Sequence, residues 1–134
     1  MRTPMTLCIN NAPGRLIFVV DDDPSIRSFI CRLLKRVTNA LVLEAAEPDV
    51  ALSLAHTIGR PIDLLVSDID LRAAKTGIDL ARELARSYPP MAVLLISARD
   101  LPEPDLPAEW RFLAKPFPVP ALVDCVRELC GSPA

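Results

Sequence analysis

Four apolar runs, spread along a chain of 134 residues, each end in a polar side chain suited to a metal ion or a phosphate group. Each run is short and continuous, which is typical of a strand covered on both faces of a parallel sheet. The carboxyl ends of parallel strands lie along one edge, where ligands bind, so the polar residues should meet in one pocket. The runs cover residues 16–20, 64–67, 93–96 and 112–114, and the polar residues that follow them are Asp21, Asp22, Asp23, Asp68, Ser97 and Lys115.

Helical patterns alternate with the apolar runs. Asp23-Pro24 is a start signal for the first helical pattern, because Asp is a favoured N-cap and Pro is favoured at the first helical position. This alternation predicts a doubly wound α/β fold with a parallel sheet. The predicted strands cover residues 16–20, 40–43, 62–66, 91–96 and 111–114, and the predicted helices cover residues 24–37, 48–58, 77–88 and 119–130.

The first and last predicted helices each carry apolar residues at helical spacing, which predicts the face that packs on the sheet. On the first helix these residues are Ile26, Phe29, Ile30, Leu33, Leu34 and Val37. On the last helix they are Val119, Leu122, Val123, Val126, Leu129 and Cys130.

The segment between the fourth and fifth strands breaks the alternation. Pro102, Pro104 and Pro107 leave little room for a full helix before Trp110. We expect an irregular segment or a single turn there.

Size and composition limit the function. The length fits one domain, predicted over residues 15–131 between a flexible leader (1–14) and a short tail (132–134). The net charge of −2 argues against a nucleic-acid surface, and no apolar run approaches the roughly 18 to 20 residues that span a bilayer. The N-terminus lacks the apolar stretch of a secretory signal, and the four cysteines form no C-x-x-C pair. We therefore expect a cytoplasmic protein with reduced thiols and with neither nucleic acid nor membrane as a partner.

The polar residues at the strand ends indicate phosphoryl chemistry. Asp21, Asp22 and Asp68 would repel one another at one edge unless a cation lay between them, and Mg²⁺ prefers oxygen ligands. Lys115 supplies a fixed positive charge, and Ser97 supplies a hydroxyl donor. Positioning and electrostatics of this kind carry most of the catalysis in phosphoryl transfer.

These motifs, in this order, resemble the receiver domain of two-component response regulators over nearly the whole chain. The resemblance rests on Asp21-Asp22-Asp23, Asp68, Ser97-Ala98 and the segment 112–116. It implies a flavodoxin-like, five-stranded parallel sheet in the order 2-1-3-4-5, here with a shortened or irregular fourth helix.

The resemblance also implies a role for each residue of the acidic cluster. Asp68 matches the aspartate that accepts a phosphoryl group from a phosphohistidine. Asp21 and Asp22 match the acidic pair that holds Mg²⁺, and Asp70 matches the position whose backbone carbonyl also binds the metal.

Three further residues match the family's phosphoryl contacts and its switch. Lys115 matches the ammonium that pairs with a phosphoryl oxygen, and Ser97 matches the hydroxyl that moves toward that group on activation. Phe112 matches the aromatic residue that swings inward with the hydroxyl. The resemblance further implies a cis peptide bond between Lys115 and Pro116.

The resemblance implies signalling rather than conventional enzyme catalysis. The partners would be a sensor histidine kinase or a histidine phosphotransfer protein, and a downstream protein target. We expect a stand-alone receiver domain that signals by conformational change or passes its phosphoryl group along a phosphorelay.

Three alternatives stay open. The first is that the chain is a receiver excised from a hybrid kinase. The second is a phosphatase that forms an aspartyl-phosphate and uses Asp70 as its acid/base. The third is an interaction scaffold that is never phosphorylated.

Two segments depart from the family pattern. The loop after Asp68 lacks the usual proline and carries Arg72 and Lys75, which either tune donor docking and phosphoryl lifetime or are only solvated. The stretch from Ser97 to Lys115 is shorter than usual, which puts the usual output face in doubt.

Overall fold

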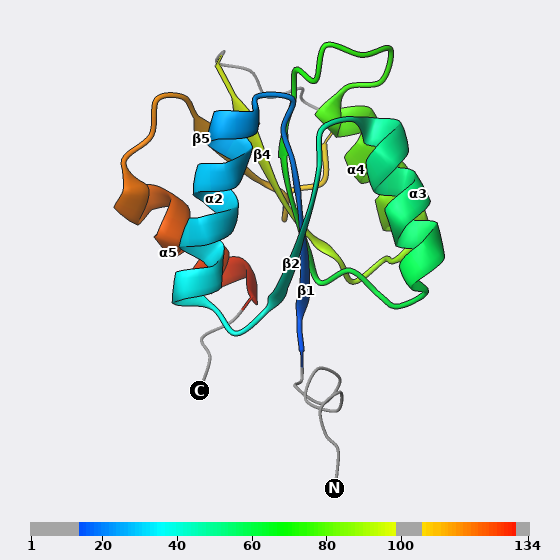
Figure 1. Ribbon diagram of the computed structural model, residues 1–134, viewed down its shortest axis with the longest axis horizontal. Coiled ribbons are helices and arrows are strands. Elements are labelled where there is room, and N and C mark those ends of the chain that lie inside the picture. The colour runs from blue at the N-terminus through cyan, green and yellow to red at the C-terminus, as the bar shows by residue number, and fades with distance from the viewer. Residues whose placement is uncertain (1–13, 99–105, 131–134) are drawn as a thin grey trace, which may run out of the picture.

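The computed structural model describes residues 14–98 and 106–130. They form a five-stranded sheet in the order β2-β1-β3-β4-β5, in which all neighbouring strands are parallel (Figure 1). The predicted fold class and strand order are therefore confirmed. Apart from Gly14, the predicted leader (1–14) and tail (132–134) lie outside the described residues.

The elements alternate along the chain as the sequence indicates. In chain order they are β1 (Leu16–Val20), α2 (Pro24–Val37), β2 (Leu41–Ala45), α3 (Pro48–Ile58), β3 (Leu64–Asp68), α4 (Gly77–Ser87), β4 (Ala92–Ser97), β5 (Arg111–Ala114) and α5 (Val119–Cys130). Within the described part of the chain, the helices are too short or too polar to cross a membrane.

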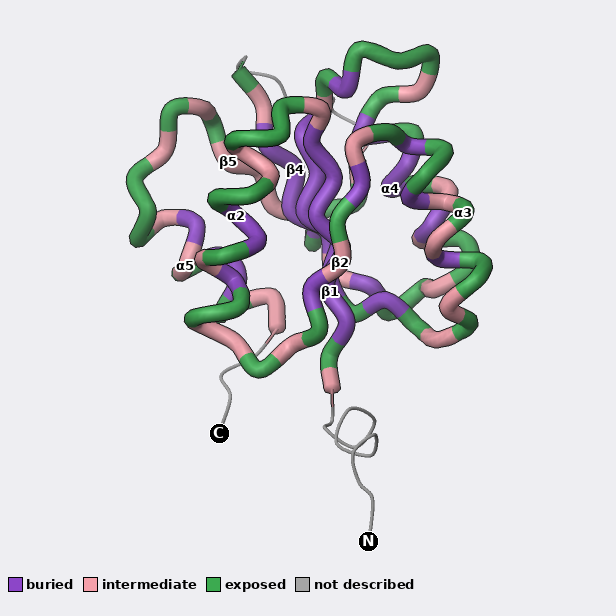
Figure 2. The backbone as a smooth tube through the Cα atoms, in the orientation of Figure 1, coloured by how far each residue is buried: buried purple, intermediate pink, exposed green. Residues whose placement is uncertain are grey.

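The sheet is covered on both faces. Helices α2 and α5 lie against one face and α3 and α4 against the other, and the central strands are buried throughout their length (Figures 1 and 2). Alternate residues of β1 point to opposite faces, so Phe18 packs toward α3 and α4 while Val19 packs toward α2 and α5. Burying a side chain of this size contributes about 1.5–3 kcal/mol.

Local signals fix the start of each helix near the pocket. The carboxylate of Asp23 accepts hydrogen bonds from the backbone N–H groups of Ser25 and Ile26, which caps α2. Thr76 and Asp79 form a reciprocal capping box at the start of α4. These caps place two helix N-termini beside the carboxyl edge of the sheet.

Three strands begin and end later than the sequence predicts. Strand β2 covers Leu41–Ala45 instead of 40–43, β3 covers Leu64–Asp68 instead of 62–66, and β4 covers Ala92–Ser97 instead of 91–96. Backbone pairing continues past the last apolar side chain, because the ladder does not depend on side-chain polarity. Asp68, for example, still pairs with Ile96 in register.

The predicted apolar faces of the first and last helices are correct except at their edges. Phe29 and Val119 are each 40% exposed, so they lie outside the core. Cys125, which the pattern left out, is buried between Leu122 and Val126 on the same face of α5. A face defined by spacing alone is wider than the strip that contacts the sheet.

The connector between β4 and β5 is described only from residue 106 onward, and the rest of the predicted irregular segment lies outside the described residues. Its described part forms a turn, in which the Trp110 N–H donates to the Pro107 carbonyl at 3.1 Å. Trp110 is buried directly before β5. The prediction of a turn in place of a helix holds for residues 106–110.

Candidate functional site

The strand-end residues meet in a pocket at the carboxyl edge of the sheet. It has a volume of about 700 Å³ and lies over β1 and β3, where the chain's crossovers change direction. All the predicted site residues except Phe112 line it. The lining residues used below are Asp21, Asp22, Asp23, Asp68, Asp70, Arg72, Ser97 and Lys115.

Strand alternation explains why three of these side chains converge. Asp21, Asp68 and Lys115 each lie two positions after a residue packed on the α2–α5 face. The ladder continues past the strands, because the Asp21 N–H donates to Ala45 at 3.2 Å and the Lys115 N–H donates to Ser97 at 2.8 Å. The three side chains therefore emerge on one side of the sheet.

The acidic cluster consists of Asp21, Asp22 and Asp68. One carboxylate oxygen from each lies within 4.8 Å of the others. Asp21 is only 1% exposed and Asp68 7%, while Asp22 is partly exposed. Two of the three carboxylates are thus largely removed from water, where their mutual repulsion is strongest.

Lys115 is the cation that faces this cluster. Its Nζ donates a hydrogen bond to Asp68 Oδ2 at 2.8 Å and lies 3.9 Å from Asp21 Oδ2. Burial lowers the pKa of Lys115, but the hydrogen bond to Asp68 and the charges of the three aspartates outweigh it, so the pKa is raised above its usual value. The side chain therefore stays charged at neutral pH.

Asp21 has one buried carboxylate oxygen without a hydrogen bond from the described residues. Its Oδ1 accepts a hydrogen bond from the Asp23 N–H at 2.9 Å, but its buried Oδ2 accepts none from the described residues. Burial raises the pKa of Asp21, and the charges of Asp68 and Asp22 add to this against the opposing effects of that hydrogen bond and of Lys115. An oxygen-only donor set with one unsatisfied buried carboxylate oxygen fits Mg²⁺.

Asp70 lies two residues after Asp68, in the loop that follows β3. Its N–H donates to Asp68 Oδ1 at 3.2 Å, and its own Oδ1 accepts from the Arg72 N–H at 3.1 Å. The side chain of Asp70 is therefore used to shape the turn. Its backbone lines the pocket, where the resemblance places a carbonyl ligand.

Ser97 and Phe112 lie on neighbouring strands. Ser97 pairs with Ala114 and Leu95 pairs with Phe112 in register, so the side chains of Ser97 and Phe112 point to the same face of the sheet. Ser97 lines the pocket, whereas Phe112 packs against the core beneath α3 and α4. The peptide bond between Lys115 and Pro116 is cis, as the resemblance implied.

Two further residues support the pocket through contacts that the sequence did not indicate. Arg27 on α2 donates from Nη1 to the Asp21 carbonyl at 2.8 Å and from Nε to Glu44 at 2.9 Å, which ties the turn after β1 to α2 and β2. Gly77 packs so closely on β3 that a Cβ there would lie 2.1 Å from the Asp68 carbonyl oxygen. Arg27 lies six residues after Asp21, and no sequence signal indicates this contact.

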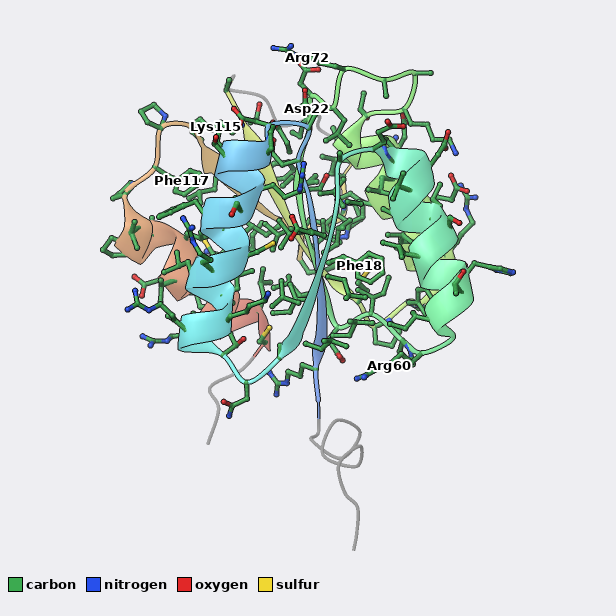
Figure 3. All side chains as sticks on the ribbon, in the orientation of Figure 1. Phe18, Asp22, Arg60, Arg72, Lys115 and Phe117 are labelled. Carbon is green, nitrogen blue, oxygen red and sulfur yellow. The ribbon has the colours of Figure 1, made fainter. Side chains whose placement is uncertain are left out.

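The two cations of the loop after β3 lie in different surroundings. Arg72 is 83% exposed in its side chain, and its Nε is 3.4 Å from Asp22 Oδ2. Lys75 instead pairs with Glu83 on α4 at 3.1 Å and with Asp49 on α3 at 3.7 Å. Lys75 therefore serves to anchor the loop, while Arg72 belongs to the pocket (Figure 3).

Comparison with known proteins agrees with this geometry. The family model for the response regulator receiver domain matches residues 17–127. A sensor kinase named CckA from Brucella abortus is 31% identical over 117 residues, which is 84% of this chain and 12% of that protein. The chain therefore corresponds to a small part of that relative.

Solved structures show the same fold. The chemotaxis protein CheY4 of Vibrio cholerae superposes with a TM-score of 0.74 at 22% identity, covering 87% of this chain and 98% of its own. The receiver domain of a hybrid histidine kinase CckA gives 0.67 at 28% identity, covering 86% and 98%. The response regulator TrrA of Thermotoga maritima, solved with Mg²⁺ and beryllofluoride, gives 0.72 at 25% identity, covering 86% and 98%.

Proposed function

The chain belongs to the response regulator receiver family, and on that premise we propose that Asp68 accepts a phosphoryl group from a phosphohistidine of a partner protein, with Mg²⁺ bound beside it. The metal would be held by the carboxylates of Asp21, Asp22 and Asp68 and by the backbone carbonyl of Asp70. The donor would be a sensor histidine kinase or a histidine phosphotransfer protein.

The observation that carries this proposal is the placement of Asp68 between opposite charges. Its carboxylate is nearly buried, it lies within 4.8 Å of two further carboxylates, and it accepts a hydrogen bond from Lys115. A structural ion pair would not need the extra acids, whose repulsion costs stability. A site that must hold a cation and an anionic phosphoryl group needs both the extra carboxylates and the Lys115 ammonium.

The chemistry follows from these charges. An oxygen of the Asp68 carboxylate forms a bond to phosphorus, the bond from phosphorus to the histidine nitrogen breaks, and that nitrogen keeps the electron pair. Lys115 balances the charge of a phosphoryl oxygen, and Ser97 donates a hydrogen bond from its hydroxyl. Bound Mg²⁺ would neutralise the charge that develops on the phosphoryl oxygens.

Ser97 and Phe112 then form the switch. Because both side chains lie on the same face of β4 and β5, movement of Ser97 toward the phosphoryl group leaves space into which Phe112 can turn. Phe112 is only partly buried, so the movement is not blocked by a closed core. The signal would pass to a protein target, or the phosphoryl group would pass onward in a relay.

The test is the intact mass of the protein after incubation with acetyl phosphate and Mg²⁺. We expect one added phosphoryl group, which is absent in Asp68→Asn and absent without Mg²⁺. Asp124→Asn, which removes an exposed acid on α5, should still gain the group. Turnover of a generic phosphate ester would instead support a phosphatase.

Two results would contradict the proposal. The first is a folded protein that does not bind Mg²⁺, which would favour a scaffold. The second is an adduct that persists in Asp68→Asn, which would place the acceptor elsewhere. If acetyl phosphate alone fails, binding of beryllofluoride with Mg²⁺ shows whether the acceptor site works and only a protein donor is missing.

A further inference from the structure

Arg72 lies at the mouth of the acidic pocket in an unusual backbone conformation. Its φ is +52°, in the left-handed region that few residues other than glycine adopt, and its N–H is held by Asp70. This turn brings the guanidinium to the pocket, where Nε is 3.4 Å from Asp22 Oδ2. Figure 3 shows Arg72 at the edge of the molecule, above Asp22 and apart from Lys115.

The pocket holds more negative than positive charge. Five aspartates line it, whereas Lys115 and Arg72 are its only cations among the described lining residues. Lys115 is committed to Asp68 by its hydrogen bond. Arg72 is the exposed cation, and its partner Asp22 is one of the three carboxylates of the metal cluster.

We propose that Arg72 is an internal counter-ion that competes with Mg²⁺ for Asp22 and then supports the phosphoryl group. The inference rests on the proposed function and adds a residue that the family resemblance does not assign. In the resting state the guanidinium weakens metal binding. Once Asp68 carries a phosphoryl group, the same charge stabilises the complex of metal and phosphoryl group together.

The two opposite effects follow from the order in which charges arrive. Mg²⁺ adds two positive charges beside Asp22. The Arg72 guanidinium repels the ion, and it must also give up its contact with Asp22 when the ion binds. The phosphoryl group then adds negative charge to the same pocket, and the guanidinium attracts it. Arg72 therefore makes the binding of the metal and of the phosphoryl group more dependent on each other. Salt weakens both effects of Arg72, because its side chain is exposed.

The experiment measures Mg²⁺ binding by calorimetry in the full chain and in Arg72→Gln, which removes the charge and leaves a shorter polar side chain. We expect the Mg²⁺ dissociation constant of Arg72→Gln to fall about three- to tenfold at low salt, as for loss of an exposed charge close to the ion. The difference in Mg²⁺ dissociation constant between Arg72→Gln and the unmodified chain should become smaller in about 0.5 M salt. At saturating Mg²⁺, beryllofluoride should bind Arg72→Gln at least about threefold more weakly.

Two controls separate this effect from others. Arg72→Lys keeps the charge and should bind Mg²⁺ as the unmodified chain does. Arg36→Gln removes the same charge from the last turn of α2, about 20 Å from the pocket, and should leave both constants unchanged.

Each other outcome has a definite meaning. Equal Mg²⁺ affinity in the unmodified chain and Arg72→Gln overturns the role of Arg72 and leaves the proposed function standing. An equal shift in Arg36→Gln also overturns it, because the effect would then come from total charge. Failure of both the chain and Arg72→Gln to bind Mg²⁺ overturns the proposed function itself, and this inference with it.

Discussion

The two segments that flank the pocket are built in opposite ways. The turn after β1 spans only residues 21–23, and hydrogen bonds from the Asp23 N–H and from Arg27 hold Asp21. The loop after β3 spans residues 69–76 and is mostly exposed, with Leu71 as its buried anchor. The first segment holds its acids in place, and the second carries Asp70 and Arg72 on a longer and more exposed backbone.

The difference shows where such a site can vary. In the short turn, each acid either caps a helix or faces the cluster, so a substitution there changes structure and chemistry together. In the long loop, the Arg72 side chain reaches the pocket while it is 83% exposed, so its charge can change while the fold remains. Under the proposed function, the turn therefore defines the site, and the loop is where it can be tuned.

The largest expected effect is at Gly77, where the long loop meets β3. A Cβ at this position would lie 2.1 Å from the Asp68 carbonyl oxygen and 2.9 Å from Ser67 Oγ, so Gly77→Ala must push α4 away from the strand. We expect a loss of about 3 kcal/mol or more in the free energy of unfolding, measured by urea denaturation. The variant should also bind Mg²⁺ weakly, because Asp68 moves.

Gly59→Ala is the matched control. Gly59 is the C-cap of α3 with a φ of +64°, and a Cβ there would meet only the Thr57 carbonyl oxygen at 4.0 Å, an ordinary contact, so alanine costs only its backbone strain, about 1 kcal/mol. A similar loss for both variants would show that the contact between Gly77 and Asp68 relaxes easily, and that the long loop is not anchored there.

The next effect concerns the brace of the short turn. Arg27→Gln removes the bond to the Asp21 carbonyl and the ion pair with Glu44, and we expect a loss of about 2 kcal/mol in stability. Because Asp21 is then held less firmly, calorimetry should also show weaker Mg²⁺ binding.

Glu44→Gln distinguishes the two contacts of Arg27. It removes only the partly exposed ion pair, which contributes about 1 kcal/mol at most, and it should leave Mg²⁺ affinity unchanged. If Glu44→Gln weakens metal binding as much as Arg27→Gln does, the ion pair and not the bond to the carbonyl holds the turn.

The same contrast explains what the sequence could predict. The short turn was predictable because its acids follow directly from a buried strand and its cap is a local signal in Asp23-Pro24. Strand order required the family resemblance, because no local pattern states which strands are neighbours. The apolar runs alone predicted that Asp21, Asp68 and Lys115 meet at the shared edge of the sheet.

The long loop was not predictable in the same way. Nothing in its composition indicates the left-handed φ of Arg72 or its choice of Asp22 as a partner, since both depend on how the loop packs across the pocket. The clamp of Lys75 between Asp49 and Glu83 likewise joins three elements that are separate in sequence. Such long-range contacts carry no signal in the sequence of the loop itself.

The smallest expected effect reverses sign with the metal. Without Mg²⁺, Asp21 is a buried carboxylate with an unsatisfied oxygen, so Asp21→Asn should raise the free energy of unfolding at neutral pH by about 1 kcal/mol. With Mg²⁺ the order should invert, because only the unmodified chain gains stability from binding, about 2.7 kcal/mol at 100 times the dissociation constant. Thermal unfolding with EDTA and with Mg²⁺ measures both.

The pH dependence of that difference tests its cause. Burial raises the pKa of Asp21 above its ordinary value of 3.8, so the folded chain binds more protons than the unfolded chain in the interval above 3.8. The contribution of Asp21 to stability is then fully present below that value and is lost as the pH rises through the raised pKa. In EDTA, the advantage of Asp21→Asn should therefore be near zero in acid and grow toward neutral pH. If the stability advantage of Asp21→Asn instead shrinks as the pH rises, Lys115 already compensates the charge of Asp21. The short turn would then be as stable without the metal as with it.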